Sequence, residues 1–382
     1  MAHALLSPSA SHRWLHCTAA PRLEAQEPDE GSDYAREGTL AHAICENKLK
    51  SWLNEQGASY EIDDTEVKEL WQDYYQPEMD NYTDEYVSII KEKYAAALAT
   101  TPDAKLHIEQ RVDLTEYIPD LFGTADAIII ADGTMEVVDF KYGKGVRVDA
   151  YDNPQMKIYA LGAWLLLSME YNIETVKMTI VQPRMDNISE FELTATDLTV
   201  WGEQTLKPKA QEALSGGTQA AGEWCQFCKV KNKCRALMKA AFDAYDAFPD
   251  PALLTLEELP EALAKLPLVK TWMTGVEEYA LGLMMQGNRI EGYKVVEGRS
   301  MSKIVDPESA RNALNAAGYD DADILKPQEL RTITDLEKLV GKKQFTELVG
   351  AYVEKPQGKP TIAKATDKRP EYNSVINDFK EF

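Results

Sequence analysis

Two strand-like segments joined by a tight turn constrain the fold of this chain more than any other feature. Residues 124–130 and 135–140 are dominated by apolar side chains, and the pair Asp132-Gly133 lies between them. An Asp-Gly pair between two such runs is typical of a β-hairpin with a two-residue turn. The sequence therefore predicts a β-hairpin in this part of the chain.

Polar residues on this hairpin are candidates for a metal site. Asp139 and Lys141 are two residues apart, so they point to the same side of a strand. If the two strands pair, Asp126 of the first strand can come close to Asp139. Two carboxylates beside one lysine can hold a divalent cation and activate a water, as phosphodiester hydrolysis requires. A surface hairpin with a solvated Asp and Lys is the alternative, because Asp-x-Lys alone is a common pattern.

Composition places the chain among ordinary globular proteins. Its 382 residues suffice for two domains, or for one large domain with an accessory region. Hydrophobic residues make up 44% and charged residues 27% of the sequence, and no apolar run approaches the roughly 20 residues of a membrane helix. The N-terminus lacks the basic flank and apolar core of a signal peptide. We therefore expect a cytoplasmic protein without membrane contact.

The formal net charge of −22 argues against a protein coated in nucleic acid. Overall charge reports on solubility and steering, however, and a local basic groove can coexist with an acidic exterior. Acidic residues are concentrated between residues 55 and 92, where we expect the solvated faces of helices. A local basic patch contains Lys229, Lys231, Lys233, Arg235 and Lys239.

The hydrophobic pattern along the chain predicts alternating helices and strands. Strands are expected at residues 106–112, 124–130, 135–140, 175–182 and 191–193. Helices are expected at residues 39–54, 66–98, 154–169 and 198–214, the third entered through Asn153 and Pro154. This order predicts an α/β fold with a covered sheet. Beyond residue 246 we expect a mainly helical region, with a helix over 256–285 interrupted at Pro260 and Pro267 and a strand-like segment at 292–296.

Three cysteines cluster within ten residues of sequence, at Cys225, Cys228 and Cys234. In a cytosolic protein, such a cluster indicates metal binding rather than disulfides. Cys17 follows a short N-terminal helix in a polar context and is the better fourth ligand, whereas Cys45 lies inside a helix and is expected to be a buried apolar group. Four thiolates suit either Zn²⁺ or a [4Fe–4S] cluster, and spacing alone does not decide between them.

Two helices carry pairs of polar side chains four residues apart. Gln155 and Tyr159 share a face of one helix, and His42 and Glu46 share a face of another. The glutamine could hold a phosphate or a base edge, and the tyrosine could stack or donate a hydrogen bond. Taken alone, the same residues also fit a helix surface, a core aromatic and a structural histidine.

Together these motifs resemble the RecB-like branch of the PD-(D/E)XK nucleases. The added cysteines are similar to those of its iron–sulfur members, which include the AddB nuclease domain and CRISPR-associated exonucleases. The opening Ser-Pro-Ser-x-Ser-x-Arg-Trp-x-x-Cys, from residue 7, is similar to phage and prophage proteins of this branch. The resemblance covers residues 7 to about 235 and rests on these motifs in this order: Gly38-Thr39-x2-His42-x3-Glu46, Gly123-Thr124-x-Asp126, Val138-Asp139-Phe140-Lys141-Tyr142, Gln155-x3-Tyr159 and Cys225-x2-Cys228-x5-Cys234.

The resemblance implies a role for each of these residues. Lys141 would position or deprotonate the attacking water and stabilise charge on the phosphate. Glu46 would contact the metal ligands without binding the metal itself. Gln155 and Tyr159 would orient the DNA backbone. The ligands of Mg²⁺ or Mn²⁺ would be His42, Asp126, Asp139 and the backbone carbonyl of Phe140. The ligands of a structural [4Fe–4S] cluster, with Zn²⁺ as the alternative, would be Cys17, Cys225, Cys228 and Cys234.

The resemblance also implies a fold and an activity. Residues 1–245 would form a restriction-endonuclease-like core, a central mixed β-sheet flanked by helices and stapled by the cluster. The chain would be a deoxyribonuclease, an exonuclease that processes DNA ends in phage recombination or replication in a bacterial host, with a single-strand-binding or annealing protein as partner. The alternative is a protein that keeps the nuclease fold but only binds nucleic acid or assembles. Residues 246–382 would be an accessory region that shapes the DNA channel, binds a partner or oligomerises the enzyme.

Two other carboxylates compete for a place in this site. Asp120 follows Pro119, giving a literal Pro-Asp upstream of Asp139, but it precedes the expected strand. Asp126 lies within the hairpin and follows Gly-Thr as the family pattern requires, so we favour it. Glu109, on a neighbouring expected strand, is a candidate for an outer group of the site.

Overall fold

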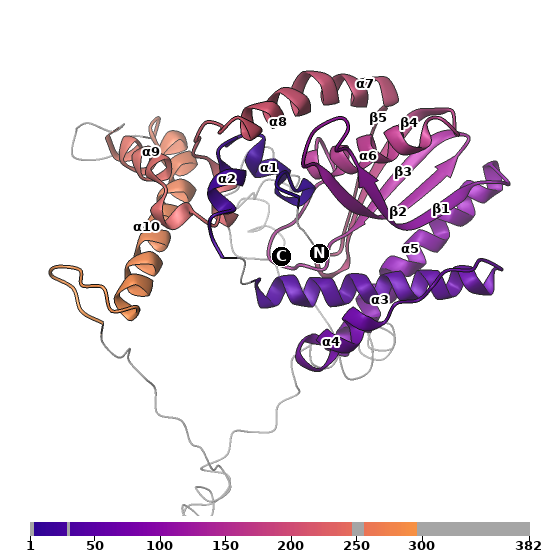
Figure 1. Ribbon diagram of the computed structural model, residues 1–382, viewed down its shortest axis with the longest axis horizontal. Coiled ribbons are helices and arrows are strands. Elements are labelled where there is room, and N and C mark those ends of the chain that lie inside the picture. The colour runs from indigo at the N-terminus through magenta and orange to yellow at the C-terminus, as the bar shows by residue number, and fades with distance from the viewer. Residues whose placement is uncertain (1–3, 29–30, 247–255, 296–382) are drawn as a thin grey trace, which may run out of the picture. The chain divides into compact units, whose positions relative to one another are not determined.

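The computed structural model describes residues 4–28, 31–246 and 256–295 (Figure 1). The chain divides into two compact units, Met1–Ile324 and Leu325–Phe382. All described residues belong to the first unit, and the second lies outside them. The domain boundary expected after residue 245 stays a prediction.

Five strands form one mixed sheet in the order β1-β2-β3-β4-β5 (Figure 1). Neighbouring strands are antiparallel except β3 and β4, which are parallel. A parallel pair needs a crossover connection, and α6 (Pro154–Leu167) supplies it. The strands are β1 (Lys105–Asp113), β2 (Phe122–Ala131), β3 (Gly133–Phe140), β4 (Ile173–Gln182) and β5 (Asn187–Thr194).

Helices cover both faces of this sheet (Figure 1). One face, which we call the α6 face, packs against α6, α7 (Ala195–Trp201), α8 (Lys207–Leu214) and the N-terminal α1 (Ser11–Trp14). The opposite face, the α3 face, packs against α3 (Asp33–Glu55) and α5 (Glu78–Thr100). The expected α/β fold with a helix-flanked mixed sheet is confirmed.

The remaining helices are short or lie at the edges of this core. α10 contacts α9 and the turn η5, and it is the described part of the helical region expected beyond residue 246. The bounds are α2 (Ala20–Glu24), α4 (Thr65–Tyr74), α9 (Arg235–Asp246), α10 (Leu259–Met285), η1 (Pro8–Ala10), η2 (Pro183–Met185), η3 (Gly202–Leu206), η4 (Glu223–Phe227) and η5 (Lys231–Lys233).

Four elements differ from what the sequence predicts, two of them for identifiable reasons. The helix expected from residue 39 begins at Asp33, because the Ser32 hydroxyl accepts a hydrogen bond from the backbone of Ala35 and caps it. The single helix expected over 66–98 is two helices, because Pro77 disfavours a helical conformation at the residue before it. α10 is not interrupted, since Pro267 lies inside it, and residues 292–295 form no strand.

Buried side chains alternate between the two faces along the strands, but the alternation reverses within β1 and β2. In β1, Ile108 lies in the core on the α3 face, whereas Val112, four residues later, lies in the core on the α6 face. In β2, Ala125 lies on the α6 face and Ala127, two residues later, lies on the α3 face. Regular pleating would put residues an even number of positions apart on the same face. Both strands therefore change sides between these residues.

The reversal is centred on Glu109 and Asp126, which lie opposite each other. The β1–β2 pairing is interrupted at this pair alone, and it continues in the same register on both sides. Glu109 has a φ of 49°, a left-handed conformation that is uncommon for residues other than glycine. Strained backbone of this kind tends to occur at functional sites. The reversal thus marks a place in the sheet where two carboxylates leave the regular pleat together.

The strained backbone at Glu109 leads to a stability prediction. Glycine within a strand normally costs roughly 0.5–1 kcal/mol relative to alanine, but a left-handed backbone costs a residue with a Cβ about 1–2 kcal/mol. Glu109→Gly should therefore be more stable than Glu109→Ala, by about 1 kcal/mol, although both lack the carboxylate. Denaturant unfolding of the two variants measures the difference.

The neighbouring Gln110 is the matched control, because it is not among the residues with positive φ. There the usual order should hold, with Gln110→Ala more stable than Gln110→Gly. The same order at both positions would contradict a left-handed backbone at Glu109.

Candidate functional site

The site lies where the β2–β3 ladder ends. Pairing of the two strands stops at Ala127 and Val138, one residue before Asp126 and Asp139. Beyond that point the backbone N–H of Phe140 donates a hydrogen bond to Asp126 Oδ2, at 2.7 Å. The carboxylate of Asp126 thus satisfies a backbone group that the ladder leaves unpaired, and it is fixed in the opening between the strands.

Helix α3 brings His42 to this opening. The apolar side chains of Leu40 and Ile44 anchor the helix on the α3 face of the sheet. His42 Nδ1 lies 3.3 Å from Asp126 Oδ1. Potential ligand atoms of His42, Glu109 and Asp126 all lie within 4.8 Å of one another. A helix and two strands therefore converge on a space that one cation could occupy.

A row of hydrogen bonds runs from Asp139 toward α6. Lys141 Nζ lies 3.0 Å from Asp139 Oδ2 and donates to Gln155 Oε1, also at 3.0 Å. Gln155 Nε2 in turn lies 3.2 Å from the Tyr159 hydroxyl oxygen. Gln155 and Tyr159 share a face of α6 because they are four residues apart. The expected pairing of Asp139 with Lys141 on one side of the strand is confirmed, and its partners come from the expected helix.

Gly123 has a specific packing role next to this row. A Cβ at this position would lie 2.9 Å from Tyr159 Cε1 and 3.0 Å from Pro8 Cγ. Contacts of that length are shorter than side chains normally tolerate, so a larger residue would push the tyrosine ring away. The glycine of the Gly-Thr-x-Asp motif therefore lets Tyr159 pack directly against β2.

The titration of the three clustered groups is mutually dependent. Burial, reinforced by Asp126, raises the pKa of Glu109 to about 8. Burial would lower the pKa of His42, but Asp126 and other carboxylates raise it to about 9. Burial opposes ionisation of Asp126, yet His42 and the Phe140 N–H hold its pKa below the usual value. Protons on Glu109 and His42 thus offset the negative charge of the clustered carboxylates, and a bound divalent cation would replace these protons.

The donor set fits a divalent metal ion. Carboxylate oxygens suit Mg²⁺ and Mn²⁺, and an imidazole suits the transition metal better. Burial raises the pKa of Asp139, and the Lys141 ammonium, whose Nζ lies 3.0 Å from the buried Oδ2, opposes that rise. The same carboxylate could contact a cation beside it. His42, Asp126 and Glu109 could therefore hold the ion, with Asp139 beside them.

Five further candidate residues of the sequence analysis differ in where they lie relative to this cluster. Asp139 faces Lys141 and is not part of the three-residue group. Glu46 lines the same hollow but forms an ion pair with Lys50, at 2.5 Å. Phe140 contributes its N–H, and a role for its carbonyl stays a prediction. Asp120 is exposed before β2, whereas Glu109, expected only as an outer group, lies within the cluster.

The four cysteines expected to act together line one cavity. It is enclosed by Cys17, Cys225, Cys228 and Cys234, together with apolar side chains that include Leu23 and Val230. The Ala220 N–H lies 3.5 Å from Cys17 Sγ, and the Gly222 N–H lies 3.5 Å from Cys225 Sγ. Burial raises the pKa of the Cys228 thiol to about 12. Amide hydrogen bonds to sulfur and a water-poor cavity both suit a metal or cluster held by thiolates.

Cys17 reaches this cavity because hydrogen bonds join the N-terminal segment to the loop that follows α8. The Ala19 N–H donates to the Thr218 carbonyl at 3.2 Å, and the Thr218 N–H donates to the Thr18 hydroxyl at 2.8 Å. Gly217 has a φ of 70°, and a Cβ there would lie 2.2 Å from the backbone of Thr18. Only glycine permits so close an approach. Cys45, in contrast, is buried in α3 and lines the hollow beside His42, as its helical position implied.

The basic patch expected at residues 229–239 is largely paired. Lys233 forms an ion pair with Glu27, and Lys239 forms one with Asp243. Lys231 donates to the backbone carbonyl of Gln226. Three of the five cations of this patch are therefore engaged in local contacts.

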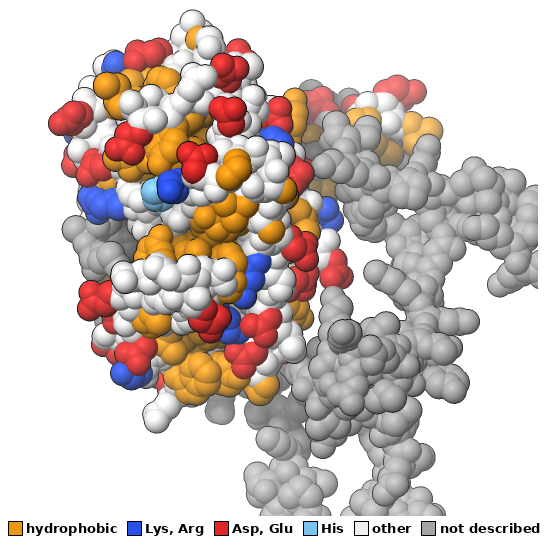
Figure 2. Space-filling model, turned by 90° about the vertical axis from the view of Figure 1, so that its right-hand side faces the viewer, with side chains coloured by type: hydrophobic (Ala, Val, Ile, Leu, Met, Phe, Trp, Pro, Cys, Tyr) orange, Lys and Arg blue, Asp and Glu red, His pale blue; other side chains and the backbone are white. Residues whose placement is uncertain are grey.

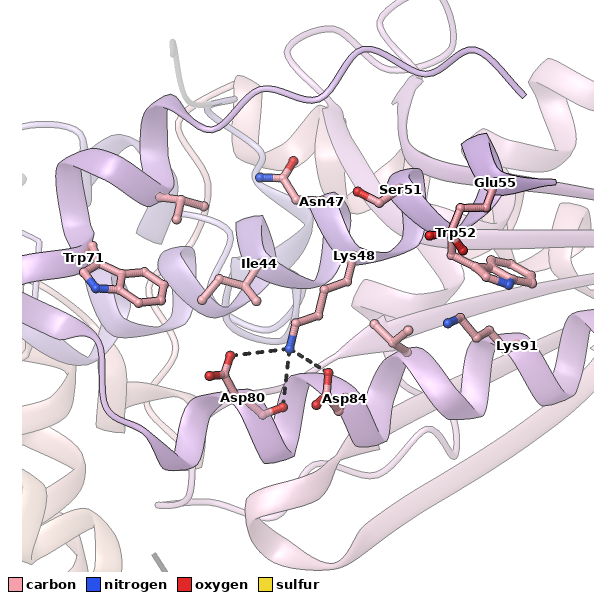
Figure 3. A pocket seen from close by; sticks show the side chains of 12 residues that line it. Ile44, Asn47, Lys48, Ser51, Trp52, Glu55, Trp71, Asp80, Asp84 and Lys91 are labelled. Carbon is pink, nitrogen blue, oxygen red and sulfur yellow. Dashed lines mark hydrogen bonds and ion pairs between the residues drawn. The ribbon is translucent and has the colours of Figure 1, made fainter. Parts of the chain in front are cut away.

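A second hollow lies between α3, α4 and α5 (Figure 3). Its aromatic walls are Trp52 and Trp71, and at its centre Lys48 bonds to Asp84 at 2.7 Å and to Asp80. The lysine is neutralised by its partners, and none of the motif residues lines this hollow. The hollow is therefore separate from the cluster around Asp126.

Comparison with known proteins identifies the family. The sequence matches the family described as "Protein of unknown function (DUF2800)" over residues 3–370. The chain belongs to this family. A solved structure titled "Crystal structure of SSO0001" is similar at 18% identity, over 50% of this chain and 96% of that chain, with a TM-score of 0.22. Because the TM-score is so low, this likeness supports no conclusion about fold or function.

Within the described ranges, the helices lack the combination of length and apolar composition that crossing a bilayer requires.

Proposed function

We propose that this chain is a metal-dependent deoxyribonuclease of the RecB-like PD-(D/E)XK type, acting as an exonuclease on DNA ends. The observation that carries the proposal is the meeting of two groups at the end of the β2–β3 ladder. One is the potential ligand set of His42, Glu109 and Asp126, and the other is the row from Asp139 through Lys141 to Gln155. A binding protein has no need for a lysine held between a buried carboxylate and an amide.

Each group of this chain has a role in the proposed reaction. A Mg²⁺ or Mn²⁺ ion would lower the pKa of a water and neutralise charge on the phosphate. The ammonium group of Lys141, held by Asp139 and Gln155, would position the attacking water and stabilise charge on the phosphoryl oxygens. Tyr159 would fix the orientation of Gln155 from the next turn of α6. Ordering these groups in advance lowers the cost of reaching the transition state.

The cleavage prediction uses end-labelled single- and double-stranded DNA with Mg²⁺ or Mn²⁺. Lys141→Ala and Asp126→Asn should each slow cleavage by about 100-fold or more, because they remove transition-state stabilisation and a metal ligand. Lys177→Ala is the matched control, since Lys177 lies on β4 and pairs with Glu192 away from the cluster. The labelled products also separate exonuclease from endonuclease action and give the polarity.

Two outcomes would contradict the proposal. Undiminished cleavage by a folded Lys141→Ala protein would show that the chemistry lies elsewhere. DNA binding in EDTA without cleavage in any divalent metal would instead favour the rival, a nucleic-acid-binding or assembly protein with a nuclease-like fold. A role in phage recombination or replication, with a single-strand-binding or annealing protein as partner, rests on the family resemblance alone.

We further propose that the cysteine cavity holds a structural [4Fe–4S] cluster that staples the N-terminal segment to the loop before α9. The support is the enclosure of four thiols in one cavity, with amide groups directed at their sulfurs. A Zn²⁺ ion would use the same ligands.

The metal content of the purified protein tests the proposed cofactor. Anaerobically purified protein should be brown and contain about four iron and four sulfide per chain, and Cys17→Ser should lose the metal and unfold at lower temperature. Cys45→Ser is the control and should keep the full metal content. Stoichiometric zinc without iron would select the alternative metal, and a metal content unaffected by Cys17→Ser would contradict the ligand set.

A further inference from the structure

The loop that follows Lys141 is held by buried hydrogen bonds and carries two exposed cationic side chains. Residues 143–148 form no helix or strand, and they connect β3, through Lys141, to the segment that leads into α6. Lys144 and Arg147 are exposed on this loop. Neither forms an ion pair or a side-chain hydrogen bond within the part of the chain that the structure describes. We call residues 143–148 the post-lysine loop.

Buried amide side chains hold this loop in one conformation. Gln182, which is 1% exposed at the end of β4, donates from Nε2 to the carbonyls of Gly143, at 2.6 Å, and Val146, at 2.9 Å. Its Oε1 accepts from the Val148 N–H at 3.1 Å. Asn187, equally buried, donates to the Val148 carbonyl at 2.8 Å. A loop fixed by this many buried hydrogen bonds presents its exposed side chains from defined positions.

The other cations at this end of the sheet are paired. Arg184 bonds to Glu37 and Glu78, and Lys50 bonds to Glu46. Lys157 forms an ion pair with Asp152. Asp and Glu side chains, drawn red, are also spread over the face of the molecule in Figure 2. In a chain with a net charge of −22, two cations without an ion-pair partner among the described residues give this rigid loop a local positive charge.

We propose that the post-lysine loop binds the DNA backbone, with Lys144 and Arg147 contacting phosphates that flank the one being cleaved. This inference rests on the proposed nuclease function and adds the contact that positions the substrate. Lys144 follows the catalytic Lys141 by three residues, so its phosphate lies close to the scissile one along the strand. Backbone contacts of this kind fix register without reading sequence. They also supply the local positive charge that an acidic protein needs to bind a polyanion.

The decisive variant is Lys144→Ala combined with Arg147→Ala, in the full-length protein. DNA binding is measured by fluorescence anisotropy with a labelled oligonucleotide and Ca²⁺, over a range of salt concentrations. The dissociation constant should rise by about tenfold, and the slope of log affinity against log salt should fall in magnitude by about 1 to 2, because two phosphate contacts are lost. Lys105→Ala with Lys177→Ala removes two cations elsewhere on the sheet and should change neither quantity.

Two further measurements separate binding from chemistry. Hydrolysis of bis(p-nitrophenyl) phosphate, which has no flanking phosphates, should proceed at the wild-type rate in the double variant but fail in Lys141→Ala. Gln182→Met keeps both cations and should weaken DNA binding with the salt slope unchanged, because the loop then loses its fixed conformation.

The outcomes distinguish this inference from the proposed function. If the wild-type protein cleaves DNA while the double variant binds it with wild-type affinity and salt slope, the inference is wrong and the nuclease assignment stands. If the wild-type protein neither binds nor cleaves DNA, the proposed function fails and the inference fails with it. Equal losses in the double variant and in the Lys105/Lys177 control would mean that only overall charge matters, which would also overturn it.

Discussion

The candidate site depends on the broken pairing between Glu109 and Asp126. At this pair both strands change sides without changing register, and β2 then separates from β3. A backbone N–H left over by that separation is satisfied by the carboxylate of Asp126. Buried charge and left-handed backbone both cost free energy, so the surrounding packing must enforce them. A cation that replaces the protons on this cluster would relieve part of that cost.

The second constraint is the connection between the two ends of the described core. The N-terminal segment packs under α6 through Leu6 and Trp14, and it meets the loop before α9 through Thr18 and Thr218. Pro8 of the same segment contacts the position of Gly123 beside Tyr159. The cysteine cavity and the row around Lys141 therefore share one structural support. If these thiols hold a metal or cluster as proposed, that group would also support the packing behind Tyr159.

Much of this arrangement could be predicted from the sequence, but one part could not. The hairpin, the helix with Gln155 and Tyr159, and the choice of Cys17 over Cys45 follow from local patterns that tertiary packing leaves unchanged. Glu109 was predicted only as an outer group, and its place within the cluster had no such signal. Apolar residues alternate regularly through β1, and β2 is apolar on both faces, so neither pattern reveals the reversal that brings this carboxylate to Asp126. The reversal becomes visible only when the pairing of β1 with β2 is known.

The most direct test of the central claim is a crystal structure of the protein soaked in Mn²⁺, analysed by anomalous scattering at the manganese edge. We predict a peak coordinated by Asp126 and His42, with Glu109 or Asp139 completing the protein ligands. Crystals of the Asp126→Asn variant, soaked in the same way, should lack the peak or show it at much lower occupancy. A manganese peak away from these residues, or no peak at saturating Mn²⁺, would contradict the account.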